Sequence, residues 1–381
     1  MPGQPTTTTD LPTRAQRLGA VATRHAAGAD RDGVLHRDVL EGILDAGFAR
    51  HFVPREWGGV AGRTSDLLHA AAALGEGCAS AAWTASVIAG AARMGAYLPE
   101  QGQRDLWAKG ADTVVVGALM PRGSATSTDG GWRLSGRWEF TSGVGFSDWA
   151  LVCATASGEH GPEAWFFALP RREYTVAESW DAVGMRGTAS DTLVADDVFV
   201  PAHRGFSRGL VMAGRSTVSA APCHTAPLRL VSGLLFGAPA LGAARHALRI
   251  WSRHTAPGAR PVEADPLTRL TLTRAATGID GAALLLERAA GVADSGTATT
   301  TDALRNPVDC AVAVEKLVDT VELLYRTIGS TGQLASNPLQ RVWRDAHTLA
   351  SHVALRFDPA ATAYGDHLLA QAREPAAQRS S

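Results

Sequence analysis

Two imidazoles close together near the C-terminal end of the chain could carry proton chemistry. Residues 341–352 read Arg-Val-Trp-Arg-Asp-Ala-His-Thr-Leu-Ala-Ser-His, which places His347 and His352 five positions apart. An imidazole can donate a hydrogen bond or take up a proton near neutral pH. On one continuous helix the two rings would lie about 140° apart, so only one is expected to face a given site. For either, the alternative is a hydrogen-bonded histidine at a helix interface.

Charged and glycine-rich segments precede these histidines. Arg341 and Arg344 are three residues apart and share a helix face, while Asp345 is four residues from Arg341. They could bind an anion, or they could form a structural ion-pair cluster at a subunit contact. The loop 329–333, which contains Gly332, could bring backbone N–H groups against a phosphate, or it could be an ordinary helix C-cap.

Composition excludes several classes of protein. The 381 residues include 36 Lys and Arg against 37 Asp and Glu, so no overall field attracts nucleic acid or anionic lipid. The apolar stretches, such as 230–241, are too short to span a membrane, and the N-terminal Pro/Thr stretch lacks the apolar region of a secretory signal. The four cysteines are far apart with no CxxC pair, which argues against a zinc ribbon or a disulfide framework. We expect no metal and a cytoplasmic location.

Periodicity divides the chain into three parts that would position these groups. Residues 13–111 are helical in pattern, short β-rich runs follow from residue 113, and long amphipathic helices return from about residue 209. Gly130-Gly131 has the form of a hairpin turn whose second strand ends at 141–143. We therefore expect an α+β multidomain protein with an N-terminal α-helical domain (1–112), a central β domain (113–208) and a C-terminal helical bundle (209–381). The predicted strands are 113–118, 132–134, 137–140, 149–154, 164–169 and 193–200, and the predicted late helices are 228–255, 266–291, 307–329 and 338–356.

Three local motifs make this order more specific. They are Phe-Val-Pro-Arg-Glu-Trp-Gly-Gly at 52–59, Gly-Met-Arg-Gly-Thr at 184–188, and the Arg344-Asp345 pair. In this order and spacing they resemble the acyl-CoA dehydrogenase fold. The resemblance implies a central β-barrel or sandwich between the helical domains, a C-terminal four-helix bundle, and a homotetramer, or at least a dimer, built by that bundle.

Members of the superfamily catalyse two kinds of reaction, and the presence or absence of a carboxylate base distinguishes them. A dehydrogenase of this family needs a Glu as general base beside its flavin, and the common position of that base is occupied here by Val353. The alternative position lies in the first helices of the last domain, yet no Asp or Glu occurs between Asp197 and Glu263. The segments Ala81-Ala82-Trp83, 136–143 and 337–345 instead resemble flavin-dependent monooxygenases of the same fold.

That resemblance implies the oxygenase component of a two-component system. Such a protein takes reduced FMN or FAD from a separate NAD(P)H:flavin reductase, adds O2 to form a C4a-hydroperoxide, and hydroxylates an aromatic or phenolic substrate. No GxGxxG motif follows a strand, so electrons are expected from outside. The alternatives are N- or S-oxidation by the same chemistry, an acyl-CoA dehydrogenase with a relocated base, and a non-catalytic flavin carrier.

The resemblance also assigns roles to single residues. Ser142 matches a hydroxyl near flavin N5 and His352 an imidazole over the flavin near C4a. The flavin-binding positions would be Trp138, Phe140, Thr141, Ser142, Gly143, Arg253, Gly332 and Arg341, and the substrate-binding positions Trp83, His224 and His347. Ordinary core packing for the tryptophans, a loop role for His224 and backbone bonding for Ser142 are the competing interpretations.

One departure from the relatives concerns the substrate. Relatives that hydroxylate simple phenols often carry a histidine in the helix after the Ala-Trp segment, where this chain has only small apolar residues at 87–92. The small residues suggest room for a bulky or polycyclic substrate.

Overall fold

The computed structural model describes residues 10–158, 161–255 and 266–378. The N-terminal Pro/Thr stretch and Glu263 lie outside these ranges. Five helices come first, and the fourth of them, α4, is an Ala- and Gly-rich helix buried on nearly every side. Small residues allow its neighbours to approach closely. The helices are α1 (Leu11–Asp32), α2 (Arg37–Ala46), α3 (Thr64–Gly75), α4 (Ala79–Gly95) and α5 (Glu100–Leu106).

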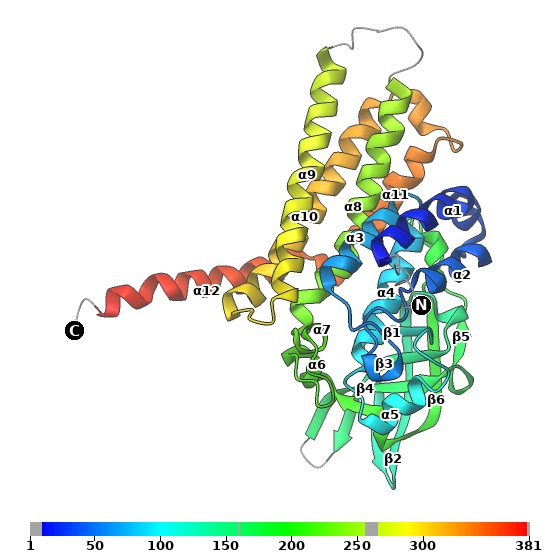
Figure 1. Ribbon diagram of the computed structural model, residues 1–381, viewed down its shortest axis with the longest axis vertical. Helices are drawn as coiled ribbons and strands as arrows, with labels where there is room; N and C mark the ends of the chain where they lie inside the picture. Colours follow the sequence, from blue (N-terminus) through cyan, green and yellow to red (C-terminus); the bar gives the residue numbers. More distant parts are fainter. Residues whose placement is uncertain (1–9, 159–160, 256–265, 379–381) are drawn as a thin grey trace, which may run out of the picture.

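Seven strands then form one sheet in the order β5-β6-β2-β1-β3-β4-β7, at the opposite end of the molecule from the tips of α8 and α9 (Figure 1). The predicted hairpin is confirmed, because Thr128 pairs with Gly131 across the turn between β1 and β2. The two runs predicted at 132–134 and 137–140 belong to the single strand β2. The strands are β1 (Val115–Thr128), β2 (Gly131–Thr141), β3 (Trp149–Gly158), β4 (Gly161–Pro170), β5 (Thr175–Ala177), β6 (Asp191–Pro201) and β7 (Gly205–Ser207).

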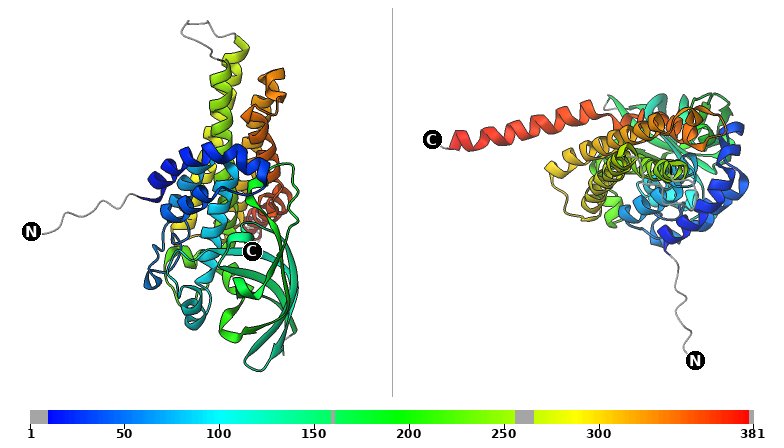
Figure 2. Two further views of the ribbon diagram at one scale, coloured as in Figure 1. Left: turned by 90° about the vertical axis from the view of Figure 1, so that its right-hand side faces the viewer. Right: turned by 90° about the horizontal axis from the view of Figure 1, so that it is seen from above.

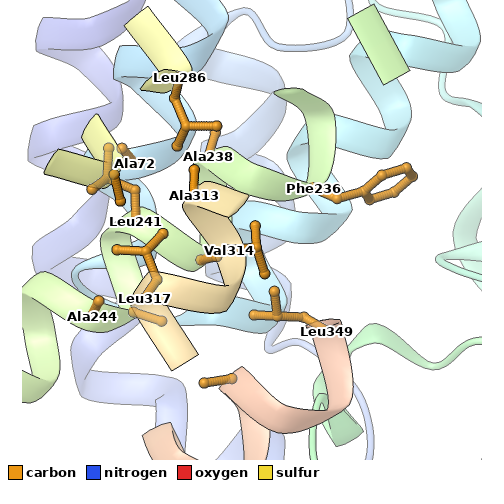
Figure 3. Close-up of a cluster of buried hydrophobic side chains, with 14 of the residues drawn as sticks. Ala72, Phe236, Ala238, Leu241, Ala244, Leu286, Ala313, Val314, Leu317 and Leu349 are labelled. Carbon is orange, nitrogen blue, oxygen red and sulfur yellow. The ribbon is translucent and has the colours of Figure 1, made fainter. Parts of the chain in front are cut away.

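The C-terminal part contains two short helices and five longer ones, of which α8, α9 and α10 lie side by side (Figures 1 and 2). Leu241, Leu286 and Leu317 from these three helices meet in a buried cluster (Figure 3). All four cysteines of the chain are buried and unpaired. The helices are α6 (Arg208–Ala213), α7 (Pro222–Thr225), α8 (Leu228–Thr255), α9 (Pro266–Asp294), α10 (Thr300–Thr327), α11 (Pro338–Ala350) and α12 (Phe357–Gln378).

Two boundaries of the predicted late helices differ most from the observed ones. The helix predicted from Pro307 begins at Thr300, since Thr299 and Asp302 form a capping box there and Pro307 is tolerated inside the helix. The helix predicted over 338–356 ends at Ala350. His352 follows in extended conformation and caps a 3₁₀ turn over Val353–Leu355. The two histidines therefore do not share a helix, and the 140° argument does not apply.

The last helix, α12, was not predicted and projects away from the body of the molecule (Figure 2). Its first half contacts α10, where His367 Nε2 lies 2.8 Å from Thr301 Oγ1. Across the described residues, no helix combines the length and the apolar character that crossing a bilayer requires.

Candidate active site

A cavity of about 770 Å³ lies where α4, the sheet and α8 meet the chain between α11 and α12. Its wall is mainly apolar, with contributions from Val87 and Gly90 of α4, Leu119 of β1, and Leu235 and Phe236 of α8. This volume is in the range of small-molecule sites. The few polar groups on the wall therefore decide what the cavity can bind and do.

Three rings form one side of the cavity. The centroid of His352 lies 3.8 Å from that of Phe236 and 5.4 Å from that of Trp83, which it meets edge-on. Figure 3 shows the Phe236 ring pointing away from the core side chains of α8 and α10. Trp83 is also fixed at its polar end, because its indole N–H donates to Ser142 Oγ at 3.0 Å.

His352 presents a hydrogen-bond donor. Its Nδ1 accepts from the backbone N–H of Ala354 at 3.2 Å, so in the neutral ring the proton lies on Nε2. Among the described residues, Nε2 has no hydrogen-bond partner. Burial lowers the pKa of His352 from 6.5 to about 4. At neutral pH the ring is uncharged and suited to donating an N–H.

Ser142 follows the end of β2, and its neighbours in sequence hold it there. Thr141 Oγ1 donates back to Trp138 O at 3.0 Å, and the N–H of Gly143 donates to Thr188 O at 3.0 Å. Gly143 has φ of 74°, a conformation that favours glycine. Ser142 Oγ lies on the cavity wall, 2.8 Å from Ser190 Oγ. Thr141 and Gly143 thus position Ser142 and do not line the cavity themselves.

The two aromatic residues of this strand differ. Trp138 touches the cavity, but its indole is buried in the β core and donates to Cys153 O at 2.6 Å. Phe140 lines the cavity mouth, is largely exposed, and meets Trp180 edge-on. Its φ of 61° is uncommon for a bulky residue and turns the ring out of the regular strand direction.

Two of the predicted substrate residues lie outside the cavity. His224 is fully buried with both ring nitrogens occupied, Nδ1 by Ser219 Oγ at 2.7 Å and Nε2 by Phe52 O at 2.6 Å. Burial lowers its pKa to about 4. His347 packs on Trp343 and lies 3.5 Å from the Glu322 carboxylate, with its side chain 42% exposed. The geometry of both fits a structural role.

The predicted phosphate-binding residues also lie apart from the cavity in this single chain. Arg253 is exposed near the end of α8, and Gly332 lies in the 3₁₀ turn over Ser330–Gln333. These two segments adjoin, since His254 Nε2 is 3.2 Å from Thr331 Oγ1. Arg341 is half-buried on α11.

The Arg344-Asp345 pair is split between two partners. Arg344 forms a bidentate ion pair with Asp30, at 2.7 and 3.0 Å. Asp345 Oδ1 accepts from the backbone N–H of Met185 at 2.6 Å and is almost fully buried. Burial raises the pKa of Asp345 to about 6. Both residues tie α11 to other parts of the chain and do not line the cavity.

The sequence reasoning missed several polar groups of the wall. Ser190 and Thr188 lie behind Ser142, while Arg93, Arg208 and Thr348 each carry a buried polar atom without a partner in the described part of the chain. Thr188 belongs to the 184–188 motif, which the sequence analysis used for the fold but to which it gave no role in the site. No local signal marked Arg93, which stands in the apolar helix α4.

The described cavity wall contains one carboxylate, Glu139, whose residue is exposed on β2. Val353, at the family position of the dehydrogenase base, is 57% exposed. A general base must be within hydrogen-bond reach of the proton it removes. The wall thus offers a hydrogen-bond donor and a hydroxyl, but no buried carboxylate base.

A surface group of His25, His36 and Asp38 has the residue types of a metal site. The two imidazoles are stacked, with centroids 3.9 Å apart and planes inclined by 12°. A metal ion lies in the plane of each ring that binds it, and two stacked planes do not converge on one ion. We assign no metal to this group.

Comparison with known proteins places this geometry in context. The family described as acyl-CoA dehydrogenase, C-terminal domain, matches residues 234–357. The oxygenase component of the FADH2-dependent resorcinol hydroxylase of Rhizobium sp. is 30% identical over 376 residues, covering 91% of this chain and 90% of its own. The 3-HSA hydroxylase of Rhodococcus sp. RHA1 superposes with a TM-score of 0.89 at 25% identity, covering 95% of this chain and 97% of its own. XiaF of Streptomyces sp., solved with FADH2 and glycerol, gives a TM-score of 0.88 at 25% identity and covers 94% and 95% of the two chains.

Proposed function

Since the chain belongs to the oxygenase components of flavin-dependent monooxygenases, we propose that it uses reduced flavin and O2 in this cavity to hydroxylate an aromatic, phenolic substrate. One observation carries the proposal. A hydroxyl, Ser142, and an uncharged N–H donor, His352, converge from two distant parts of the chain on an apolar cavity, and the described residues of its wall include no buried carboxylate. A desaturase of this fold requires that carboxylate, whereas an oxygenase does not.

The cavity residues fit a flavin ring. The walls of Trp83, Phe236 and Phe140 provide apolar and aromatic surface, and Ser142, Thr348 and His352 provide polar groups with unused hydrogen-bonding capacity. A buried polar group without a partner costs stability, so its persistence at a cavity wall supports a ligand that pairs with it. When bound, the reduced flavin supplies the electrons that activate O2 for insertion of one oxygen atom into the substrate. The diffusible cofactor is reduced FMN or FAD.

The residues of the chain would control protons and water. Ser142 Oγ would accept a hydrogen bond from the flavin edge, and the His352 Nε2–H would donate one to the reacting oxygen or to the substrate. The apolar wall keeps water away, which suppresses loss of hydrogen peroxide as a side reaction. Because the pKa of His352 is near 4, donation by the neutral ring is favoured over uptake of a substrate proton.

The charges around the cavity support a phenolic substrate. Five arginines lie on its wall (Arg93, Arg122, Arg208, Arg229 and Arg356), and none of them pairs with a carboxylate among the described residues. Arg93 is only 1% exposed, and within the described ranges it donates to two backbone carbonyls, those of Cys223 and Ala226. A buried cation favours the anionic form of a nearby phenol, and a phenolate is the more reactive form toward an electrophilic oxygen. This supports hydroxylation at carbon over oxidation of nitrogen or sulfur.

Size favours a large ring system. Gly90 and Ala91 of α4, which carry little or no side chain, face the cavity, and the cavity has about 770 Å³ to share between flavin and substrate. We therefore propose a substrate of more than one ring.

We also propose a homotetramer and a separate flavin reductase as partners. Several leucines on α9 and α12 are more than half exposed in the single chain, namely Leu267, Leu270, Leu284 and Leu369. Exposed apolar groups on long helices favour self-association. In an oligomer, Arg253 and Gly332 at the tip of the bundle could reach a flavin phosphate held mainly by a neighbouring subunit.

A coupled assay tests this function. The protein is mixed with a flavin reductase, NADH, FAD or FMN, air and a panel of mono- and polycyclic phenols, and the products are identified by mass spectrometry. We expect a product heavier by one oxygen atom, formed only when the reductase and flavin are present. Consumption of NADH with hydrogen peroxide as the sole product across the panel, or a desaturated acyl thioester in a parallel arm, would contradict the proposal.

A further inference from the structure

A row of buried hydroxyl groups runs along the cavity wall. Trp83 Nε1 donates to Ser142 Oγ at 3.0 Å, Ser142 Oγ is 2.8 Å from Ser190 Oγ, and Ser190 Oγ is 2.7 Å from Thr188 Oγ1. The row ends where Thr188 Oγ1 donates to the backbone carbonyl of Met185 at 2.9 Å. The three hydroxyl residues are 7%, 4% and 1% exposed, so water does not interrupt the row.

The number of protons fixes the direction of every bond in this row. An indole N–H can only donate and a carbonyl oxygen can only accept, whereas a hydroxyl has one hydrogen to give. Thr188 gives its hydrogen to Met185 O, so Ser190 must donate to Thr188. Ser142 must then donate to Ser190. With its hydrogen used in this way and one lone pair occupied by Trp83, Ser142 can only accept a further hydrogen bond.

The backbone carbonyl of Met185, at the end of the row, is fixed in its orientation. Met185 N–H donates to the buried carboxylate of Asp345 at 2.6 Å, and Met185 O also accepts from Trp180 Nε1 at 3.0 Å. A Cβ at Gly184 would lie 2.3 Å from Arg344 O, so this loop packs directly on the backbone of α11. The acceptor that sets the direction of the row is therefore held from both sides.

We infer that Ser190 and Thr188 are positioning residues which make Ser142 an acceptor-only group and thereby select the reduced over the oxidised flavin. The inference rests on the proposed function, in which Ser142 faces N5 of the flavin ring. N5 carries a hydrogen in reduced flavin, which Ser142 can accept. In oxidised flavin N5 is a bare acceptor, and two lone pairs then face each other. A protein that receives its flavin from a separate reductase gains from this preference, because oxidised flavin competes less for the site.

The direct test measures binding, without turnover. Dissociation constants of the full-length protein are measured for oxidised FAD, and anaerobically for dithionite-reduced FAD, with FMN in a parallel series. In the wild type we expect reduced flavin to bind about tenfold or more tightly than oxidised flavin, a size typical of one misdirected buried hydrogen bond. In Ser190→Ala the Ser142 hydroxyl is free to turn and donate to oxidised N5, so the preference should fall by about tenfold, mainly through tighter binding of oxidised flavin.

Matched variants separate this effect from a general loss of structure. Ser190→Thr keeps a hydroxyl and should retain the wild-type preference within about twofold. Ser147→Ala removes another buried hydroxyl of the sheet region, bonded to Tyr174 and away from the cavity wall, and should leave the preference unchanged. Thr188→Val breaks the same row one step further in and should lower the preference too, which keeps the test decisive if Ser190→Ala does not fold.

The outcomes are distinguishable. If wild type binds neither form of flavin, the proposed function fails. If wild type binds reduced flavin without preferring it, or if Ser190→Ala and Thr188→Val weaken both forms equally, the function stands and the inference is overturned.

Discussion

Replacing His352 by Phe tests the role of its N–H while keeping the packing of the ring. The ring lies 3.8 Å from Phe236 and 5.4 Å from Trp83, so a phenyl group can fill the same space. The substitution removes the Nε2–H, which has no partner among the described residues and so is free for the reaction. It also removes the Nδ1 acceptor of the Ala354 N–H, a bond that caps the 3₁₀ turn. One preorganised donor aimed at developing charge contributes about 10²- to 10³-fold in rate. We expect product formation in His352→Phe to fall by that amount.

The assay follows product, hydrogen peroxide and reduced-flavin affinity together. In His352→Phe, reduced flavin should still bind within a few-fold of wild type, while the oxygen consumed appears mainly as hydrogen peroxide. His347→Ala is the matched control, because His347 is outside the cavity and partly exposed beside Glu322. It should change product formation by less than about twofold. If His352→Phe keeps more than half of the wild-type rate, or if His347→Ala is the damaging change, the assignment of the donor is refuted.

Stability measurements give an independent check on the same residue. Burial lowers the pKa of His352 from 6.5 to about 4, so the unfolded chain binds this proton more readily than the folded protein. The contribution of His352 to stability is therefore lost as pH falls from about 6.5 toward 4, which amounts to about 2 kcal/mol between pH 7 and pH 5. A phenyl ring does not titrate, so His352→Phe does not lose stability in this way. The difference in Tm between His352→Phe and wild type should therefore increase as the pH is lowered from 7 to 5. A difference in Tm that does not change with pH would show that the ring is not buried in the neutral form.

Three further predictions concern other parts of the account. Ser142→Ala should keep the fold but speed the elimination of hydrogen peroxide by about 5- to 150-fold, as expected for one lost hydrogen bond; an unchanged elimination rate would remove Ser142 from the site. The Tm of Asp345→Asn relative to wild type should rise as the pH increases from 4 to 6, because the carboxyl ionises near pH 4 in the unfolded chain but keeps its proton to about pH 6 in the folded protein, so that wild type loses stability over this interval. The Asn side chain accepts the same Met185 N–H uncharged, and a Tm difference that stays constant with pH would contradict this prediction. Sedimentation at micromolar concentration should give four times the subunit mass of 39.8 kDa, and a species of one subunit mass would exclude the oligomer.

The order of helices and strands could be predicted from the sequence because it depends on local sequence patterns. Helical periodicity in residues 228–255 gives the bounds of α8 as observed, and the Gly130 turn gives the hairpin of β1 and β2. The end of α11 was not accessible in this way. Helix propensity continues through residue 356, but the side chain of His352 accepts from Ala354 N and starts a new turn. Histidine is not among the residues preferred at helix N-caps, so the sequence did not mark this boundary.

The site could be predicted only in part, because the residues that form it are far apart in the sequence. Ser142 and His352 were reached through resemblance, and both lie on the cavity wall. Ser190 comes beside Ser142 only because β2 and β6 pair, with Thr141 opposite Asp191. The position of His224 away from the cavity was not predictable for the same kind of reason, since one of its hydrogen-bond partners is the carbonyl of Phe52, far away in the chain. No local pattern shows that a histidine is already saturated.

The central claim is that reduced flavin in this cavity delivers one atom of O2 to an aromatic substrate, and isotope labelling tests it most directly. The protein, a separate reductase, NADH, flavin and a phenolic substrate that it turns over are incubated under ¹⁸O2 in ordinary water, and the product mass is measured. The account predicts one ¹⁸O atom per product molecule, and none when the label is supplied as H2¹⁸O under ordinary O2. A product without label from ¹⁸O2, or a product that has lost two hydrogens and gained no oxygen, would contradict it.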